Sequence, residues 1–220
     1  MLNAVRKNLK CDKNDNKNSK KMDNILIKNS LNNTISYSAY RSFIKKLISE
    51  GKSTGIEQSD DRLIFSKLND TRMDRLDKTL KISEDTQNSL NNLNKGFTFL
   101  VIAEGWCGDA AQILPIINKV AEASDKIDFK IVFRDENEAL MNQYLTNGSK
   151  SIPKVLILDQ ENNVLDSWGP RPFVASKMVV DYKAQNGSLD EDFKKNLQIW
   201  YNKDKGNNTQ EELLSLLKAS

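Results

Sequence analysis

A single cysteine stands where a buried strand is predicted to pass into a helix. Phe97 to Ala103 is a dense apolar run, rich in the β-branched and aromatic residues that suit a buried strand. After a short Glu-Gly-Trp turn, apolar residues recur with helical spacing at positions 113, 114, 117, 120 and 121. The sequence therefore places Cys107 at the first turn of a helix.

This position has a chemical consequence for Cys107. The first N–H groups of a helix lack intrahelical partners, and the helix dipole adds positive charge there. Cysteines so placed have pKa values lowered from about 8.5 toward roughly 3.5–7.5, and the thiolate is the nucleophile. We therefore expect a reactive Cys107 with a lowered pKa. The alternative is a small buried hydrophobe, and the charge of Asp109 opposes a thiolate.

The stretch resembles the thioredoxin superfamily. It shares Trp106-Cys107-Gly108 after a buried strand, Pro115 in the following helix, and Ser151-Ile152-Pro153 before another apolar strand. The resemblance spans roughly residues 97 to 185, and the Trp-Cys-Gly-Asp-Ala motif is similar to that of a bacterial thioredoxin-like family with helical extensions. It implies an α/β, three-layer fold, in which helices flank a central mixed sheet of about four strands.

The resemblance also implies roles for residues around the cysteine. A cis Ile152–Pro153 bond would expose the backbone of Ile152, which pairs with an extended substrate segment. Trp106 would form an apolar wall beside the thiol. The alternatives are a trans proline that starts a strand and a partly buried core tryptophan. Arg171 either approaches the site or is exposed.

Two residues depart from the family pattern, and one of them, Ala110, is expected to modulate the site together with Gly108 and Asp109. Ala110 stands where thioredoxins carry their second cysteine, and Val101 stands where many of them bury an acidic residue. An intramolecular disulfide is therefore impossible, and the buried proton acceptor is missing.

Two classes of function remain open. The first is a monothiol protein in which Cys107 exchanges with protein or low-molecular-weight disulfides, or senses oxidants, and an external thiol resolves the product. The second is a redox-inactive thioredoxin-fold interaction module that has lost the dithiol. The retained Trp106 and Pro153 favour the first class, and the two departures favour the second.

Composition narrows the alternatives further. The 33 basic and 30 acidic residues nearly balance, which argues against nucleic-acid or membrane-surface binding. With no histidine and only two cysteines, no metal site or cofactor is expected. The sequence has no apolar stretch long enough to span a membrane and no secretory signal pattern, so we expect a cytoplasmic protein.

The chain divides into four predicted segments. Residues 1–33 are rich in Asn and Lys and are expected to be a disordered leader, in which Cys11 has no role and Met22 is an alternative start. Residues 34–96 form a helical extension packed on the core, residues 97–186 the thioredoxin-like domain, and residues 187–220 C-terminal helices. The domain has a predicted βαβαββα order.

The helical extension contains a docking candidate. A helix is predicted from Asp61 to Leu80, and its apolar residues are expected to face inward: Phe65, Leu68, Met73, Leu76 and Leu80. The opposite, charged face is either a solvated surface or a docking site for a protein partner.

Overall fold

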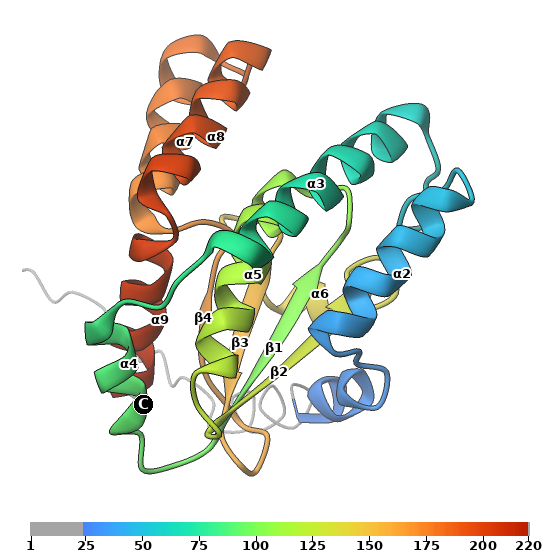
Figure 1. Ribbon diagram of the computed structural model, residues 1–220. Coiled ribbons are helices and arrows are strands. Elements are labelled where there is room, and N and C mark those ends of the chain that lie inside the picture. The colour runs from blue at the N-terminus through green and yellow to red at the C-terminus, as the bar shows by residue number, and fades with distance from the viewer. Residues whose placement is uncertain (1–23, 220) are drawn as a thin grey trace, which may run out of the picture.

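A four-stranded mixed sheet forms the centre of the computed structural model, which describes residues 24–219 (Figure 1). Its strands are β1 (Phe97–Ala103), β2 (Ile127–Phe133), β3 (Lys154–Leu158) and β4 (Val164–Trp168), in the order β2-β1-β3-β4. β1 pairs with β2 in parallel, whereas β1–β3 and β3–β4 are antiparallel. β1 and β3 are central and buried along their length, as their apolar runs require.

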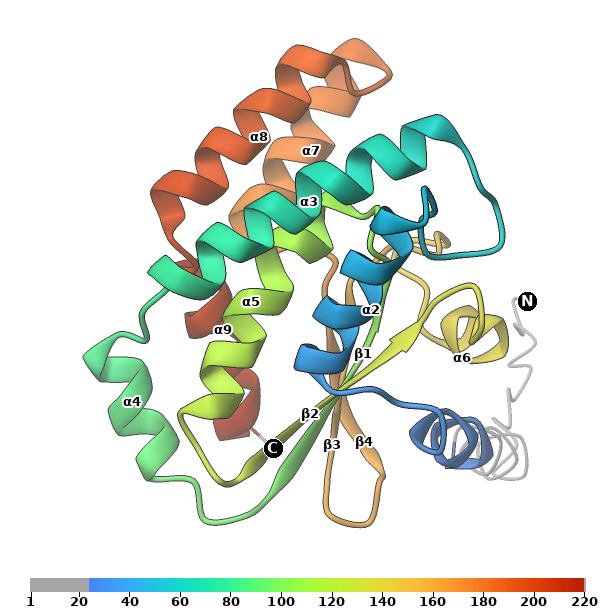
Figure 2. The same cartoon turned by 45° about the vertical axis from the view of Figure 1, so that its right-hand side comes forward.

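Helices cover both faces of this sheet. α5 (Gly108–Glu122) follows β1, α6 (Glu138–Gln143) follows β2, and α7 (Phe173–Asn186) follows β4. Figure 2 shows α5 on one side of the sheet and α6 on the other. The mixed sheet, its helices and the βαβαββα order confirm the predicted thioredoxin-like fold class.

The remaining helices belong to the two ends of the chain. α2 (Tyr37–Ser49), α3 (Asp60–Thr79) and α4 (Glu84–Asn91) precede the sheet, and each begins after a serine whose hydroxyl accepts a backbone N–H. α8 (Glu191–Asp204) and α9 (Asn207–Ala219) follow it. α3 and α9 both pack against α5, and α4 packs against α9. None of the described helices combines the length and apolarity needed to cross a membrane.

The expectation of disorder through residue 33 is wrong for its last part. Residues 24–31 form a helix, in which Ile27 is fully buried and the hydroxyl of Ser30 donates to the side chain of Asn137. The strand-like contact between Ile35 and Ile131 then joins this segment to the edge of β2. A few apolar contacts to the core therefore suffice to order an Asn-rich segment. Residues 1–23, including Cys11 and Met22, lie outside the described residues.

The predicted inward face of α3 is correct only in its second half. Met73 and Leu76 are buried, whereas Phe65 and Leu68 are 43% and 44% exposed. The first half of the buried stripe is polar and includes Asn69. Because the buried side and the exposed side of α3 both carry apolar residues, the spacing of apolar residues alone did not show which side faces the core.

An ion-pair network fixes this orientation of α3. Arg41 on α2 is 7% exposed, and its guanidinium contacts Asp70, Asp74 and Asp77 on α3 at 2.8, 2.6 and 3.3 Å. Three acidic residues spaced three to four apart line the face of α3 that meets α2. The charged face is therefore turned partly toward the protein, and apolar side chains remain outside.

Candidate active-site region around Cys107

Cys107 is the N-cap residue of α5, as its position after the strand predicted. Its backbone is extended (φ −79°, ψ 116°), and its Sγ accepts the backbone N–H of Ala110 at 3.4 Å. The thiol in turn donates to the carbonyl oxygen of Ile152 at 3.3 Å. Cys107 is only 8% exposed, and Ala110 is fully buried. The sulfur therefore sits between a helix N-terminus and the segment before Pro153.

The Pro153 segment lies directly beside the thiol. The Ile152–Pro153 peptide bond is cis, and both residues are buried. Gly169 packs over this segment with φ +112°, and a Cβ there would lie 2.3 Å from the carbonyl oxygen of Pro153. Only glycine fits this close approach, so the turn after β4 is held against the Pro153 segment.

The turn between β1 and Cys107 is held by the N-terminal helices. Gly105 donates its N–H to the hydroxyl of Thr54 at 2.8 Å, and its carbonyl accepts the amide of Asn69 at 3.0 Å. A Cβ on Gly105 would lie 3.0 Å from Ile44 of α2. The segment that presents Cys107 is therefore positioned by residues that lie 36 to 61 positions before Gly105 in the chain. Thr54 and Asn69 were not singled out in the sequence, since no local pattern marks them.

Trp106 is enclosed by two arginines. The guanidinium groups of Arg62 and Arg134 lie 4.7 and 4.8 Å from the centre of its ring, and Asp135 contacts Arg134 at 2.8 Å and Arg62 at 3.8 Å. Cation–π contacts of this kind contribute about 0.5–2 kcal/mol each. Trp106 is thus half-buried between these charged side chains. Less of its ring is left to contact a molecule bound beside the thiol.

Asp109 connects the start of α5 to the C-terminal part of the chain. Its carboxylate contacts the guanidinium of Arg171 at 2.5 Å and accepts the hydroxyl of Tyr201 at 3.0 Å. The side chains of Asp109 and Arg171 are 11% and 21% exposed, and Tyr201 is 4% exposed. Arg171 therefore approaches the site, as one of the two interpretations of the sequence held. The part played by Tyr201 was missed, because it lies 92 residues from its partner.

α8 continues this cover along α5. The side-chain amide of Gln112 donates to that of Gln198 at 2.8 Å, and a Cβ on Gly108 would come within 4 Å of Arg72 from α3 and Gln198 from α8. Figure 2 shows α3 crossing the upper end of α5, with α8 running beside α3. The two helical extensions thus meet over the first turn of α5.

The environment of Cys107 shifts the pKa of its thiol in the direction opposite to the predicted one. Burial, reinforced by the negative charge of Asp109, raises the pKa of the thiol to about 12. The backbone N–H groups of Ala110 and Asp109 and the charge of Arg171 act in the opposite direction but are weaker. The prediction of a lowered pKa is therefore wrong. The prediction took account of the helix N-terminus but not of the helices that pack over the thiol and exclude water.

Two further buried groups accompany the thiol. Glu104 and Tyr40 are both fully buried, and burial raises the pKa of each. The two acidic groups nearby, Cys107 and Glu104, add to the rise in the pKa of Tyr40. Glu104 is a buried carboxyl close to the site, although Val101 occupies the position at which the resemblance led us to look for one. The sequence placed Glu104 only in a turn.

The site has one described thiol and no described metal cluster. Cys107 is a free cysteine, and Ala110 and Val101 are fully buried where a thioredoxin has its second cysteine and its acid. Among residues 24–219, no group of three or more Cys, Asp, Glu or His side chains is arranged to hold a metal ion. The described residues bring together Cys107, Trp106, Gly108, Asp109, Ala110, Ile152 and Pro153, the full set selected from the sequence.

Comparisons with known proteins agree with this architecture. A family model described as thioredoxin matches residues 56–186, which is more than half of the chain and includes α3 and α4. A protein of unknown function from Pseudomonas aeruginosa has a similar structure, with a TM-score of 0.54 and 19% identity over 71% of this chain and 90% of that one. An HIV epitope-scaffold gives a TM-score of 0.53 and 19% identity, covering 84% and 99%. These two likenesses show a common fold. No curated protein matches the chain.

Proposed function

Since the chain belongs to the thioredoxin family, we propose that it is a thioredoxin-fold interaction module in which Cys107 is kept as a neutral, enclosed thiol. The observation that carries this proposal is the enclosed, hydrogen-bonded state of the Cys107 sulfur. The thiol donates to the carbonyl of Ile152 while Cys107 is 8% exposed beneath the helical extensions. The single-cysteine Trp-Cys-Gly-Asp-Ala motif is then a family site that has lost exchange chemistry.

A thiol in this state is a poor nucleophile. Exchange requires a thiolate that can reach a disulfide sulfur in line. With a pKa of about 12, the thiolate fraction at pH 7 is on the order of 10⁻⁵. The carbonyl of Ile152, which the resemblance assigns to substrate pairing, already accepts the thiol. The closed site therefore offers neither the nucleophile nor the backbone contact that exchange needs.

Reaction with oxidised glutathione tests this proposal. In a Cys11→Ser background, Cys107 is the only thiol. Native protein should acquire no glutathione adduct by mass spectrometry over a period in which the denatured protein is fully modified. Stoichiometric modification of the native protein would show an active exchange site instead.

A monothiol exchange protein is the second candidate, and one observation favours it. The sulfur retains a backbone donor at 3.4 Å and lies beside a cis Ile152–Pro153 bond, which are the features that the family uses. On opening of the cover, the Cys107 thiolate would attack a disulfide, form a mixed disulfide and expel one thiolate. An external thiol would then attack the mixed disulfide and release Cys107. Peroxide could alternatively oxidise the opened thiol to a sulfenic acid.

The proposed partner of the module is another protein, bound at the outer face of α3. Ile64, Phe65 and Leu68, which lie on two adjoining turns, are 59%, 43% and 44% exposed, and such apolar side chains favour protein contact over a small-molecule ligand. A photo-crosslinking residue at position 65 should capture a second polypeptide in cells, and one at Lys195 on α8 should not. Equal capture at both positions would contradict this surface. A cytoplasmic, reducing location fits a free Cys107 thiol.

A further inference from the structure

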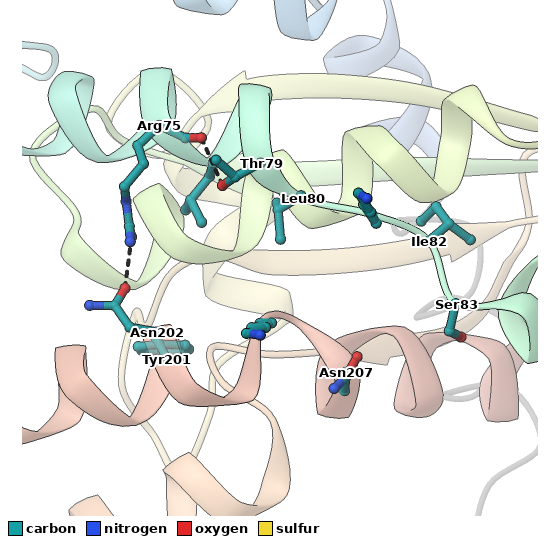
Figure 3. Close-up of a pocket in the computed structure, with 11 residues that line it drawn as sticks. Arg75, Thr79, Leu80, Ile82, Ser83, Tyr201, Asn202 and Asn207 are labelled. Atoms are coloured by element: carbon teal, nitrogen blue, oxygen red, sulfur yellow. Dashed lines mark hydrogen bonds between the residues drawn. The ribbon is translucent and has the colours of Figure 1, made fainter.

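A cavity of about 570 Å³ lies between the two helical extensions, and Cys107 is not among its lining residues. One wall comes from the end of α3 and the linker to α4, and the other from the end of α8 and the start of α9. Figure 3 shows Arg75 and Thr79 on the first wall, and Tyr201, Asn202 and Asn207 on the second. This volume is within the range of about 300–1,000 Å³ that is typical of small-ligand pockets.

The walls are fixed to one another by side-chain hydrogen bonds. The guanidinium of Arg75 donates to Asn202 at 2.7 Å, which joins α3 to α8 (Figure 3). Gln210, which is 1% exposed, accepts the backbone N–H of Ser83 at 3.2 Å and donates to the carbonyl of Lys81 at 3.4 Å. The cavity is thus held open by defined contacts, since the linker between α3 and α4 is hydrogen-bonded to α9.

The charge of the lining has one sign. Arg75, Lys81 and Lys205 line the cavity, and no Asp or Glu is among its described lining residues. Of the nearby carboxylates, Asp77 accepts from Tyr37 and Arg41. Asp204 accepts from Asn208 through one oxygen, while its second oxygen is buried without a partner and is not part of the lining. Three cationic residues that line one concave site attract an anion, because a low-dielectric wall concentrates their field.

The rest of the lining is largely apolar. Leu76, Leu80 and Ile82 come from α3 and the linker, and Tyr201 faces them from α8. A bare inorganic anion would leave this surface in water, whereas an anion with a hydrocarbon body would cover it. Asn202, Asn207 and Ser83 add polar groups at the edge.

We propose that this cavity binds a small organic anion, with a phosphate or carboxylate held by Arg75, Lys81 and Lys205 and an apolar body against Leu80 and Ile82. The thioredoxin-like core alone does not contain this site, because both walls come from the extensions. The site therefore gives the helical extensions a role that is independent of Cys107.

Titration with phenyl phosphate tests the proposal. Amide signals of residues 76–83 and 201–207 should shift in ¹⁵N–¹H spectra of the full chain. Inorganic phosphate lacks the apolar body and phenol lacks the charge, so both should bind at least roughly tenfold more weakly, a difference of about 1.4 kcal/mol. Binding of phenol as tight as that of phenyl phosphate would overturn the role of the cations. Equally tight binding of inorganic phosphate would overturn the role of the apolar wall.

A charge-matched pair of variants locates the site. Lys81→Gln combined with Lys205→Gln should weaken phenyl phosphate at least roughly tenfold. Lys195→Gln combined with Lys203→Gln removes the same charge from exposed positions of α8 outside the cavity, and should leave the affinity within about twofold. All four positions are exposed, so both variants should fold, as circular dichroism would verify. Equal affinities in the two variants, or no shift in the named segments, would refute the site.

Discussion

Two opposing effects act on the sulfur of Cys107. The backbone N–H groups at the start of α5 favour the thiolate, as they do at any helix N-terminus. Burial removes the water that solvates a thiolate, and the carboxylate of Asp109 repels it. Burial is the larger effect, so the folded protein holds the proton more tightly than the unfolded chain does.

The raised pKa of the Cys107 thiol predicts that the folded protein loses stability at alkaline pH. The unfolded thiol ionises near pH 8.5, whereas the folded one has a pKa of about 12. Stability from Cys107 is therefore complete below the unfolded pKa and is lost as pH rises toward the folded pKa. The free energy of unfolding of the wild type, relative to Cys107→Ala, should fall by about 1.4 kcal/mol per pH unit across this window.

Urea unfolding at several pH values between about 8 and 11 would measure this difference. Ionisation of tyrosines in the unfolded chain is common to both proteins and cancels in the comparison, and burial keeps Tyr40 and Tyr201 protonated in both folded proteins over this range. If the unfolding free energies of the two proteins change in parallel with pH, the thiol is not held protonated by the fold.

At the scale of elements, α8 is the part of the chain that closes the site. It contributes Tyr201 to Asp109 and Gln198 to Gln112. A hydrogen bond to a charged group contributes about 1.5–3 kcal/mol and one between neutral groups about 0.5–1.5 kcal/mol, so the Tyr201–Asp109 bond is the larger of the two contributions to holding α8 in place. α8 is attached by side-chain contacts that substitution can weaken singly.

Tyr201→Phe should therefore open the cover without removing a buried charge. We expect unfolding to become easier by about 1–3 kcal/mol, and Cys107 to be alkylated faster than in the wild type at neutral pH. Tyr182→Phe is the matched control, since it removes a tyrosine–carboxylate bond to Asp190, the N-cap residue of α8, and leaves the contacts of Asp109 intact. Equal alkylation rates in the two variants would show that α8 does not protect the sulfur.

The first turn of α5 makes a second prediction. Position 110 lies one turn after Cys107, and its N–H already contacts the sulfur at 3.4 Å. Ala110→Cys should therefore place a second sulfur within disulfide range, and a mild oxidant should form an intramolecular disulfide detectable as a loss of two mass units. Ala110→Ser, which cannot form this bond, controls for the added volume at a fully buried position. A folded Ala110→Cys protein with two persistent thiols would contradict the geometry assigned to this turn.

At the scale of the whole molecule, sequence was informative where an interaction is local. The apolar run of β1 and the periodicity after Cys107 placed the cysteine at the start of α5 correctly. The pKa could not be predicted in the same way, because its largest cause is burial of the thiol, which arises only after distant helices have packed over the start of α5. The outward Phe65 was missed for a similar reason, since α2 decides which face of α3 is buried.

The folded molecule encloses Cys107 as a neutral thiol, and this is the central claim to test. The rate of alkylation by iodoacetamide against pH, in a Cys11→Ser background, tests it most directly. The rate should be low at neutral pH and continue to rise through pH 10 without a plateau, because the pKa of the folded thiol is about 12, while denatured protein should give the midpoint of a free thiol, about 8.5. A native midpoint at or below that free value would contradict the account and restore Cys107 as a reactive nucleophile.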